Sequence, residues 1–193
     1  METWLLPALL GLGLAASTGL KTFLPLLMLA VAARFHLFGI ELSGPFAWLG
    51  SLTALAALSI ATATEFVADK VPFVDHALSL FGVVARPAAG ALAAAAAFNT
   101  LDPGAAAVAG LIIGAPTALA VHTAQSGARI TSTATTGGFA NPLVSLAEDV
   151  AAFFTALLAM VAPILVPVVL LVAGFVVWRA IVALRGGPRV RRA

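Results

Sequence analysis

The stretch EFVADKVPFVDH, residues 65–76, decides how this chain is organised. It ends an apolar run, residues 42–64, that contains no charged side chain. On a helix, Glu65 and Asp69 lie on one face because they are four residues apart, and like charges at this spacing repel. An ionised carboxylate inside lipid is costly and normally faces a partner or a wet cavity. The stretch therefore predicts that Lys70, another helix, a proton or a bound cation neutralises these acids.

The composition is too apolar for a soluble domain. Of the 193 residues, 62% are hydrophobic and 9% are charged, and the mean hydropathy is +1.10; a soluble domain carries about 25% charged residues. We predict an all-α, polytopic transmembrane bundle of about six to seven helices. We expect a single transmembrane domain, residues 1–185, that is embedded in the lipid bilayer. The absence of cysteine excludes disulfides, thiolate catalysis and cysteine-ligated metals.

Positive charge is concentrated at the C-terminal end. Half of the ten basic residues follow residue 178: Arg179, Arg185, Arg189, Arg191 and Arg192. Under the positive-inside rule, this predicts a cytoplasmic C-terminus with a basic tail, residues 186–193. A short arginine cluster after a span is usually a topology anchor, so no nucleic-acid partner is expected. The first residues lack the basic region of a signal peptide, so we expect a retained N-terminal helix.

A weak internal repeat suggests that two helices are broken. The motif Ala-Ser-Thr-Gly at residues 16–19 is followed after five residues by Pro25-Leu26, and the motif Ala-Thr-Thr-Gly at residues 134–137 is followed after four residues by Pro142-Leu143. Interrupted helices at matching positions in two halves of a chain are typical of transporters. We therefore predict two repeats with breaks at Ser17–Gly19 and Thr133–Gly138. The alternatives are a chance similarity, a single kinked helix at the first motif and, for residues 127–141, either a surface loop or a re-entrant segment.

Helix breaks inside lipid expose backbone groups that must be buried in protein or face water. Hydroxyl and carbonyl oxygens at such breaks are suitable ligands for an ion or a small polar solute. We predict a substrate- or ion-binding site built from the two breaks and the polar residue that follows the second. Its members are Ser17, Thr18, Gly19, Thr135, Thr136, Gly137 and Asn141.

Four carboxylates form the second part of the predicted site: Glu65, Asp69, Glu148 and Asp149. Glu65 ends one polar stripe on its helix and Glu148 ends another, so the two stripes can meet at the centre of the bundle. A carboxylate buried there is suited to proton coupling or cation binding. For Lys70 and Asp75, the favoured alternative is helix capping at the membrane surface. The predicted charge partners of the acids are Lys21, Lys70, Arg86 and Arg129.

The sequence favours neither a metal centre nor an enzyme. His76 and His122 lack the spacing of a metal-binding motif, and packed or hydrogen-bonded histidines are commoner. Ser17 and Lys21 are four residues apart, as in a Ser–Lys catalytic pair, but this spacing often occurs by chance. We therefore expect no catalytic residues, no metal and no cofactor.

Several motifs resemble those of one known family. They are GLKTFLPL at residues 19–26, EFVADKVP at 65–72, RPAAG at 86–90, and STATTGGFANP at 132–142 with Glu148-Asp149 after it. Together they resemble the bacterial integral-membrane family labelled domain of unknown function 4126, over nearly the whole chain. The resemblance implies a small multi-span protein of the bacterial inner membrane with no agreed activity. It supplies no functional residues.

The predicted function is that of a small transporter or channel-like protein for an ion or small polar solute. Buried carboxylates would couple transport to protons or cations, and the protein would assemble as a homo-oligomer. The alternative is a non-transporting membrane scaffold or lipid-handling protein in which the acids and arginines form structural ion pairs. The depth and pairing of the acids distinguish the two, because transport needs carboxylates and interrupted backbone in one hydrated pocket.

Overall fold

The computed structural model describes residues 2–70 and 72–185. Every regular element in these residues is helical, which confirms the predicted all-α class. The α-helices are α1 (Glu2–Leu20), α2 (Leu24–Arg34), α3 (Leu52–Ala68), α4 (Pro72–Ala97), α5 (Pro103–Ala109), α6 (Ala115–Thr136), α7 (Asn141–Val161) and α8 (Val166–Arg185). Shorter helical segments are η1 (Leu37–Gly39), η2 (Gly44–Gly50), the π-helical η3 (Gly110–Gly114) and η4 (Pro163–Leu165).

Three helical segments are long and apolar enough to cross a membrane. They are Leu80–Ala97 in α4, the continuous rod Pro103–Thr136 formed by α5, η3 and α6, and α7. A fourth crossing results if η2 and α3, which meet at an angle of 62°, act as one span. The architecture is therefore compatible with a membrane protein. The predicted basic tail, residues 186–193, lies outside the described residues.

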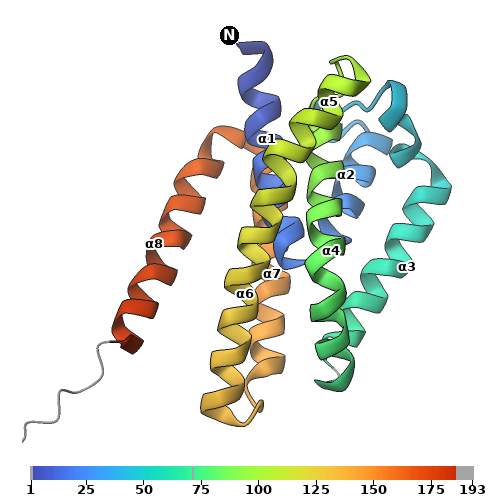
Figure 1. The fold of residues 1–193 in the computed structure, drawn as a ribbon. Helices are drawn as coiled ribbons and strands as arrows, with labels where there is room; N and C mark the ends of the chain where they lie inside the picture. The colour runs from blue at the N-terminus through green and yellow to red at the C-terminus, as the bar shows by residue number, and fades with distance from the viewer. Residues whose placement is uncertain (1, 71, 186–193) are drawn as a thin grey trace, which may run out of the picture.

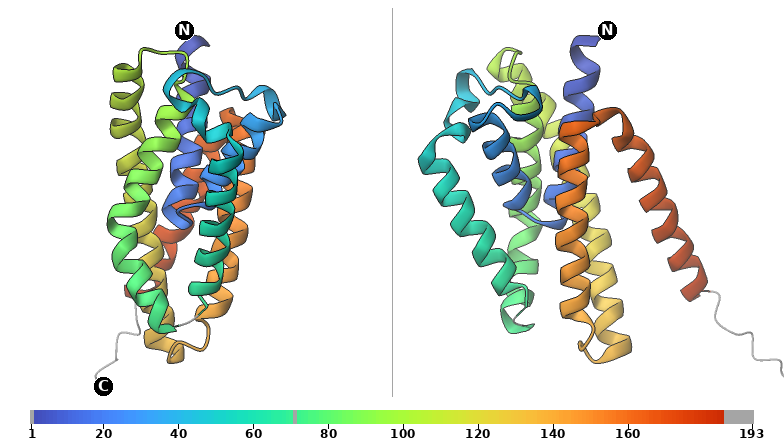
Figure 2. Two further views of the ribbon diagram at one scale, coloured as in Figure 1. Left: turned by 90° about the vertical axis from the view of Figure 1, so that its right-hand side faces the viewer. Right: turned by 180° about the vertical axis from the view of Figure 1, so that it is seen from behind.

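The helices alternate in direction along the bundle (Figure 1). From the end where α1 begins, α3, the α5–α6 rod and α8 run to the opposite end, and α4 and α7 return. α1 is the central helix, because it packs against α4, α6 and α7. α8 diverges from the other helices, and its residues 171–179 are exposed (Figure 2).

α1 and α2 form a hairpin that enters the bundle from one end and returns to that end (Figure 2). With 11 residues, α2 is about 16 Å long, which is roughly half the hydrocarbon thickness of a bilayer. The turn of this hairpin, residues 21–23, therefore lies within the bundle. Lys21, at the turn, has no exposed surface.

The first predicted break, Ser17–Gly19, lies a few residues too early. α1 continues past it because the hydroxyl groups there have partners. Ser17 Oγ donates to the carbonyl of Ala152 at 2.6 Å, and Thr18 Oγ1 donates within its own helix at 2.7 Å. The backbone is interrupted only at residues 21–23, where side chains of other helices bind it.

The second predicted break, Thr133–Gly138, is a turn between two helices rather than an interruption within one. α6 continues through Thr136, Gly137 follows with a φ of +63°, and α7 starts at Asn141. Threonine hydroxyls near the end of α6 donate to carbonyls of their own helix, so they do not interrupt it. Residues 127–141 are therefore neither a surface loop nor a re-entrant segment, but the end of α6 and a short connection to α7.

Small residues allow the central helices to approach one another closely. Ala93, Ala94 and Ala96 of α4 are completely buried. A Cβ atom added at Gly114 of η3 would meet the α4 backbone, 2.9 Å from Cα of Ala91. Such close approach at glycine and alanine is typical of helices packed in membranes.

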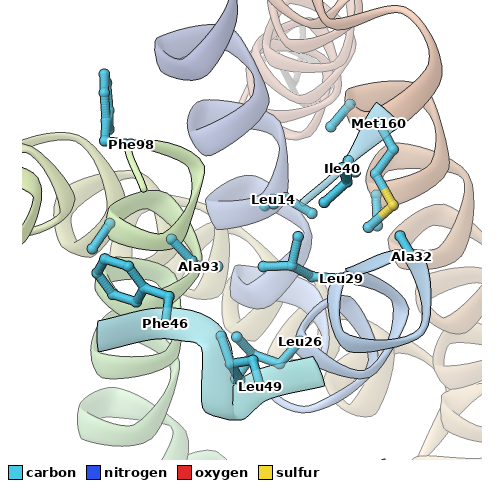
Figure 3. Packing of buried hydrophobic residues seen from close by; sticks show 14 of the residues in the cluster. Leu14, Leu26, Leu29, Ala32, Ile40, Phe46, Leu49, Ala93, Phe98 and Met160 are labelled. Atoms are coloured by element: carbon cyan, nitrogen blue, oxygen red, sulfur yellow. The ribbon is translucent and has the colours of Figure 1, made fainter. Parts of the chain in front are cut away.

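Larger apolar side chains surround α2 (Figure 3). Leu26 and Leu29 of α2 belong to one cluster with Leu14 of α1 and with Phe46 and Leu49 of η2. All five are buried. The 3₁₀ segment η2 therefore covers the outer part of α2 and holds this short helix inside the bundle.

We expect Gly114→Ala to destabilise the protein by about 1–3 kcal/mol, because the added methyl group overlaps the α4 backbone at Gly90 and Ala91. Gly127 lies in the same rod but has open space around it, so Gly127→Ala should be neutral or stabilising by up to about 1 kcal/mol. Thermal unfolding in detergent micelles measures both changes. Equal midpoints for the two variants would contradict the close contact between η3 and α4.

Candidate functional site

The turn of the α1–α2 hairpin places Lys21 between two acids from distant parts of the chain. Its ammonium group pairs with Asp69, which follows α3, and lies 2.6 Å from Oδ1 of Asp149 on α7. Its Nζ is also 5.4 Å from the centre of the Phe66 ring, within the range of a cation–π contact. Because the lysine side chain is fully buried, these groups must compensate for its lost hydration.

Lys70 supplies a second cation to Asp149 from a more solvated position. Its Nζ lies 3.4 Å from Oδ2 of Asp149, and its side chain is 46% exposed. The two lysines, Asp69 and Asp149 together carry no net formal charge. Asp149 therefore connects a buried cation, Lys21, to an exposed one.

Glu65 binds the backbone of the same turn. Its carboxylate oxygens accept hydrogen bonds from the backbone N–H groups of Thr22 at 2.8 Å and Phe23 at 3.1 Å. The first N–H groups of a helix have no partner within that helix, and an anion there also interacts favourably with the helix dipole. The buried Glu65 side chain thus satisfies the start of α2.

Arg86 of α4 binds the other side of the turn. Its Nη1 donates to the carbonyl of Gly19 at 2.8 Å and to Oε1 of Gln125, and it lies 2.9 Å from Nδ1 of His122. Because α1 ends at Leu20, the Gly19 carbonyl lies in the last turn, where carbonyl groups lack partners within the helix. Arg86 and Glu65 therefore satisfy the two ends of one interruption with opposite charges.

Gln125 joins this turn to a second ion pair. Arg129 of α6 binds Glu148 of α7, with its Nε 3.0 and 3.1 Å from the two carboxylate oxygens. Nε2 of Gln125 donates to Glu148 at 2.7 Å, while its Oε1 accepts from Arg86. The amide thus links Arg86 to the Arg129–Glu148 pair through direct hydrogen bonds.

Most predicted site residues lie together around the hairpin turn. We call the charged side chains around this turn the charged layer. It contains the four predicted acids and their four predicted partners: Glu65, Asp69, Glu148, Asp149, Lys21, Lys70, Arg86 and Arg129. Ser17 and Thr18 are buried in α1 beside the layer, and Gly19 contributes its carbonyl group. The two polar stripes predicted from the sequence therefore reach the same region of the bundle.

The other predicted site residues lie at the α6–α7 turn. Thr135, Thr136 and Gly137 are exposed there, and the side-chain amide of Asn141 donates to a threonine of α6 at 3.0 Å. Thr136 is seven residues, or about 10 Å of helix, beyond Arg129. The described residues therefore do not combine both predicted breaks in one site, because the second hydroxyl-rich segment is helical.

Two buried contributors to the charged layer were not predicted: Gln125, and His122 as a neighbour of Arg86. The available signal was the spacing of His122, Gln125 and Arg129, which puts three polar side chains on one face of an otherwise apolar helix. The expectation that His122 is a packed, hydrogen-bonded histidine agrees with this position. The side chains of Asp75 and His76 lie outside the described part of the structure.

The charged layer is a network of ion pairs and hydrogen bonds. Among residues whose side chains are described, no three histidine or acidic side chains form a group that could hold a metal ion. Each acid instead faces an ammonium group, a guanidinium group or backbone N–H donors.

Residues 8–183 match a protein family described as "Domain of unknown function (DUF4126)". The matched region includes the whole charged layer and the turns at residues 21–23 and 137–140. No curated protein and no solved structure matches the chain.

We expect Lys21→Met to destabilise the protein by about 3–5 kcal/mol, because it leaves Asp69 and Asp149 without their buried cation. The matched control is Lys70→Met, which removes an exposed partner of Asp149 and should cost less than about 1 kcal/mol. Chemical unfolding of both variants in micelles tests this difference. A Lys21→Met protein as stable as the Lys70→Met protein would show that the buried pairs do not hold the hairpin turn.

Proposed function

Since the chain belongs to the DUF4126 family, whose description states no activity, we propose from its geometry that it is a small membrane transporter or channel-like protein. It carries an ion or a small polar solute and couples this movement to protons or cations. We place it in the bacterial inner membrane with its C-terminus in the cytoplasm. This orientation follows from the arginines that end the sequence.

One observation carries the proposal: the interrupted backbone of the α1–α2 hairpin meets the charged layer inside the bundle. Val161, the last residue of α7, comes twelve positions after Asp149, which is about 18 Å of helix. Charged groups at such depth are expensive in lipid and usually mark a pathway for ions or substrates. Transporter sites are commonly formed where half-helices end near the middle of the bilayer.

The contacts suggest how coupling works. The Lys21 ammonium group occupies the position between Asp69 and Asp149 that a cation would take. Protonation of an aspartate, or arrival of a cation, weakens the hold on Lys21 and frees the hairpin turn to move. Glu148 responds in the same way, because its protonation weakens the contacts to Arg129 and Gln125.

We assign no catalytic role to Ser17 and Lys21. The Ser17 hydroxyl donates to the Ala152 carbonyl, and two carboxylates hold the Lys21 ammonium group. The pair is therefore better explained by packing and charge balance.

A second candidate function is a non-transporting scaffold or lipid-handling protein. The observation that favours it is that the acids of the charged layer already have partners. A balanced network of this kind can specify a structure without binding anything. The two candidates make different predictions for charge-neutral and charge-reversed variants.

Under the transport proposal, Glu148→Gln abolishes ion flux in proteoliposomes while the protein still inserts, because the side chain keeps its shape but can no longer exchange a proton. The measurement uses vesicles with an entrapped pH-sensitive dye and imposed proton, Na⁺ or K⁺ gradients. Glu41→Gln is the matched control, because the Glu41 side chain is 78% exposed and lies outside the charged layer. Unchanged flux in Glu148→Gln would count against transport through this layer.

Reversal of the Arg129–Glu148 pair separates the candidates. Each single variant, Arg129→Glu or Glu148→Arg, should unfold more easily because it places like charges together. The double variant should recover most of this stability. Under the transport proposal, the unmodified protein carries ion flux and the stable double variant does not. A double variant that recovers stability, together with an unmodified protein that carries no flux, would favour the scaffold.

A further inference from the structure

The hydroxyl groups on the α6–α7 hairpin fall into two classes. The threonine hydroxyls of the first class donate to the backbone carbonyl four residues earlier on α6 or just before it; these are Thr117, Thr123, Thr131, Thr135 and Thr136. The hydroxyls of Ser132 and Ser145 have no hydrogen-bond partner in the described residues, although neither oxygen is exposed.

Two contacts between α6 and α7 locate these serines. Arg129 binds Glu148 on one side of them, and Asn141 binds Thr133 on the other. Ser132 follows Arg129 by three residues, and Ser145 precedes Glu148 by three, so both belong to the face along which the helices meet. The Oδ1 atom of Asn141 is also buried without a partner. Three unpaired oxygens therefore lie between the Arg129–Glu148 pair and the turn at residues 137–140.

An unpaired buried polar group destabilises a protein by about 1–3 kcal/mol, so such groups are almost always satisfied by protein or by water. A buried water molecule needs two to four polar partners, and hydroxyl and amide groups provide them. A metal cation is a poor alternative here, because the guanidinium group of Arg129 lies at the inner end of the row. Water accepts from that group and donates to the oxygens.

We propose that the seam between α6 and α7 holds a file of bound water molecules that connects Glu148 to the aqueous phase at residues 137–140. The turn lies at the same end of the bundle as the end of α8, which is the cytoplasmic side in the proposed orientation (Figure 1). The file gives Glu148 a route for proton exchange, and this role rests on the proposed transport function. The presence of the water does not depend on it.

The test uses the natural absence of cysteine, so each variant carries a single thiol. Ser145→Cys is compared with Ala156→Cys, which is also buried on α7 but lies beyond the charged layer. The purified protein in vesicles is treated with Ag⁺, and the remaining free thiol is titrated after denaturation. Ag⁺ should modify Ser145→Cys at least tenfold faster than Ala156→Cys. Ser132→Cys should react as fast as Ser145→Cys, because both thiols line the same file.

A blocking substitution completes the experiment. Ser132→Val, added to Ser145→Cys, should slow modification at least tenfold, while the exposed thiol of Thr135→Cys with the same addition keeps its rate. Equal rates at positions 145 and 156, or no effect of Ser132→Val, would overturn the water file. Fast modification of Ser145→Cys in a protein without ion flux would leave the file in place and remove only the transport role.

Discussion

The structure depends on the buried ammonium group of Lys21, held between Asp69 and Asp149. A fully buried cation in a bundle of this composition requires anions within contact distance. Asp69 follows α3 and Asp149 belongs to α7, so this one side chain holds three parts of the chain together. The two carboxylates therefore fix the hairpin turn, because they hold the ammonium group of Lys21.

Two kinds of packing meet at that point. Towards the end where the hairpin enters, glycine and alanine let α1, α4 and the α5–α6 rod approach at backbone distance. Around the turn, long charged side chains from α3, α4, α6 and α7 bind one another and the interrupted backbone. The interruption is possible because Glu65 and Arg86 bind its N–H and C=O groups, which apolar side chains could not satisfy.

Much of this arrangement follows from the sequence. Low charge and high hydropathy indicate a helical membrane bundle, and the spacing of Glu65 and Asp69 indicates that these acids need partners. The position of the interruption does not follow, because it depends on contacts from α3 and α4 that have no local signature. The hydroxyl-rich end of α6 is helical although its composition favours a break there. Composition alone does not show that threonine hydroxyls donate to the carbonyl groups of their own helix. Gln125 was missed because it is uncharged.

The charged layer also has an asymmetry that bears on its function. Asp149 contacts two cations, of which Lys21 is buried and Lys70 is 46% exposed. Salt and solvent screen the exposed contact far more strongly than the buried one. In the proposed transport cycle, a cation would therefore meet the contact between Lys70 and Asp149 before it reaches the pairs around Lys21. In that proposal, Asp149 links an exposed cation to the buried cation that holds the hairpin turn.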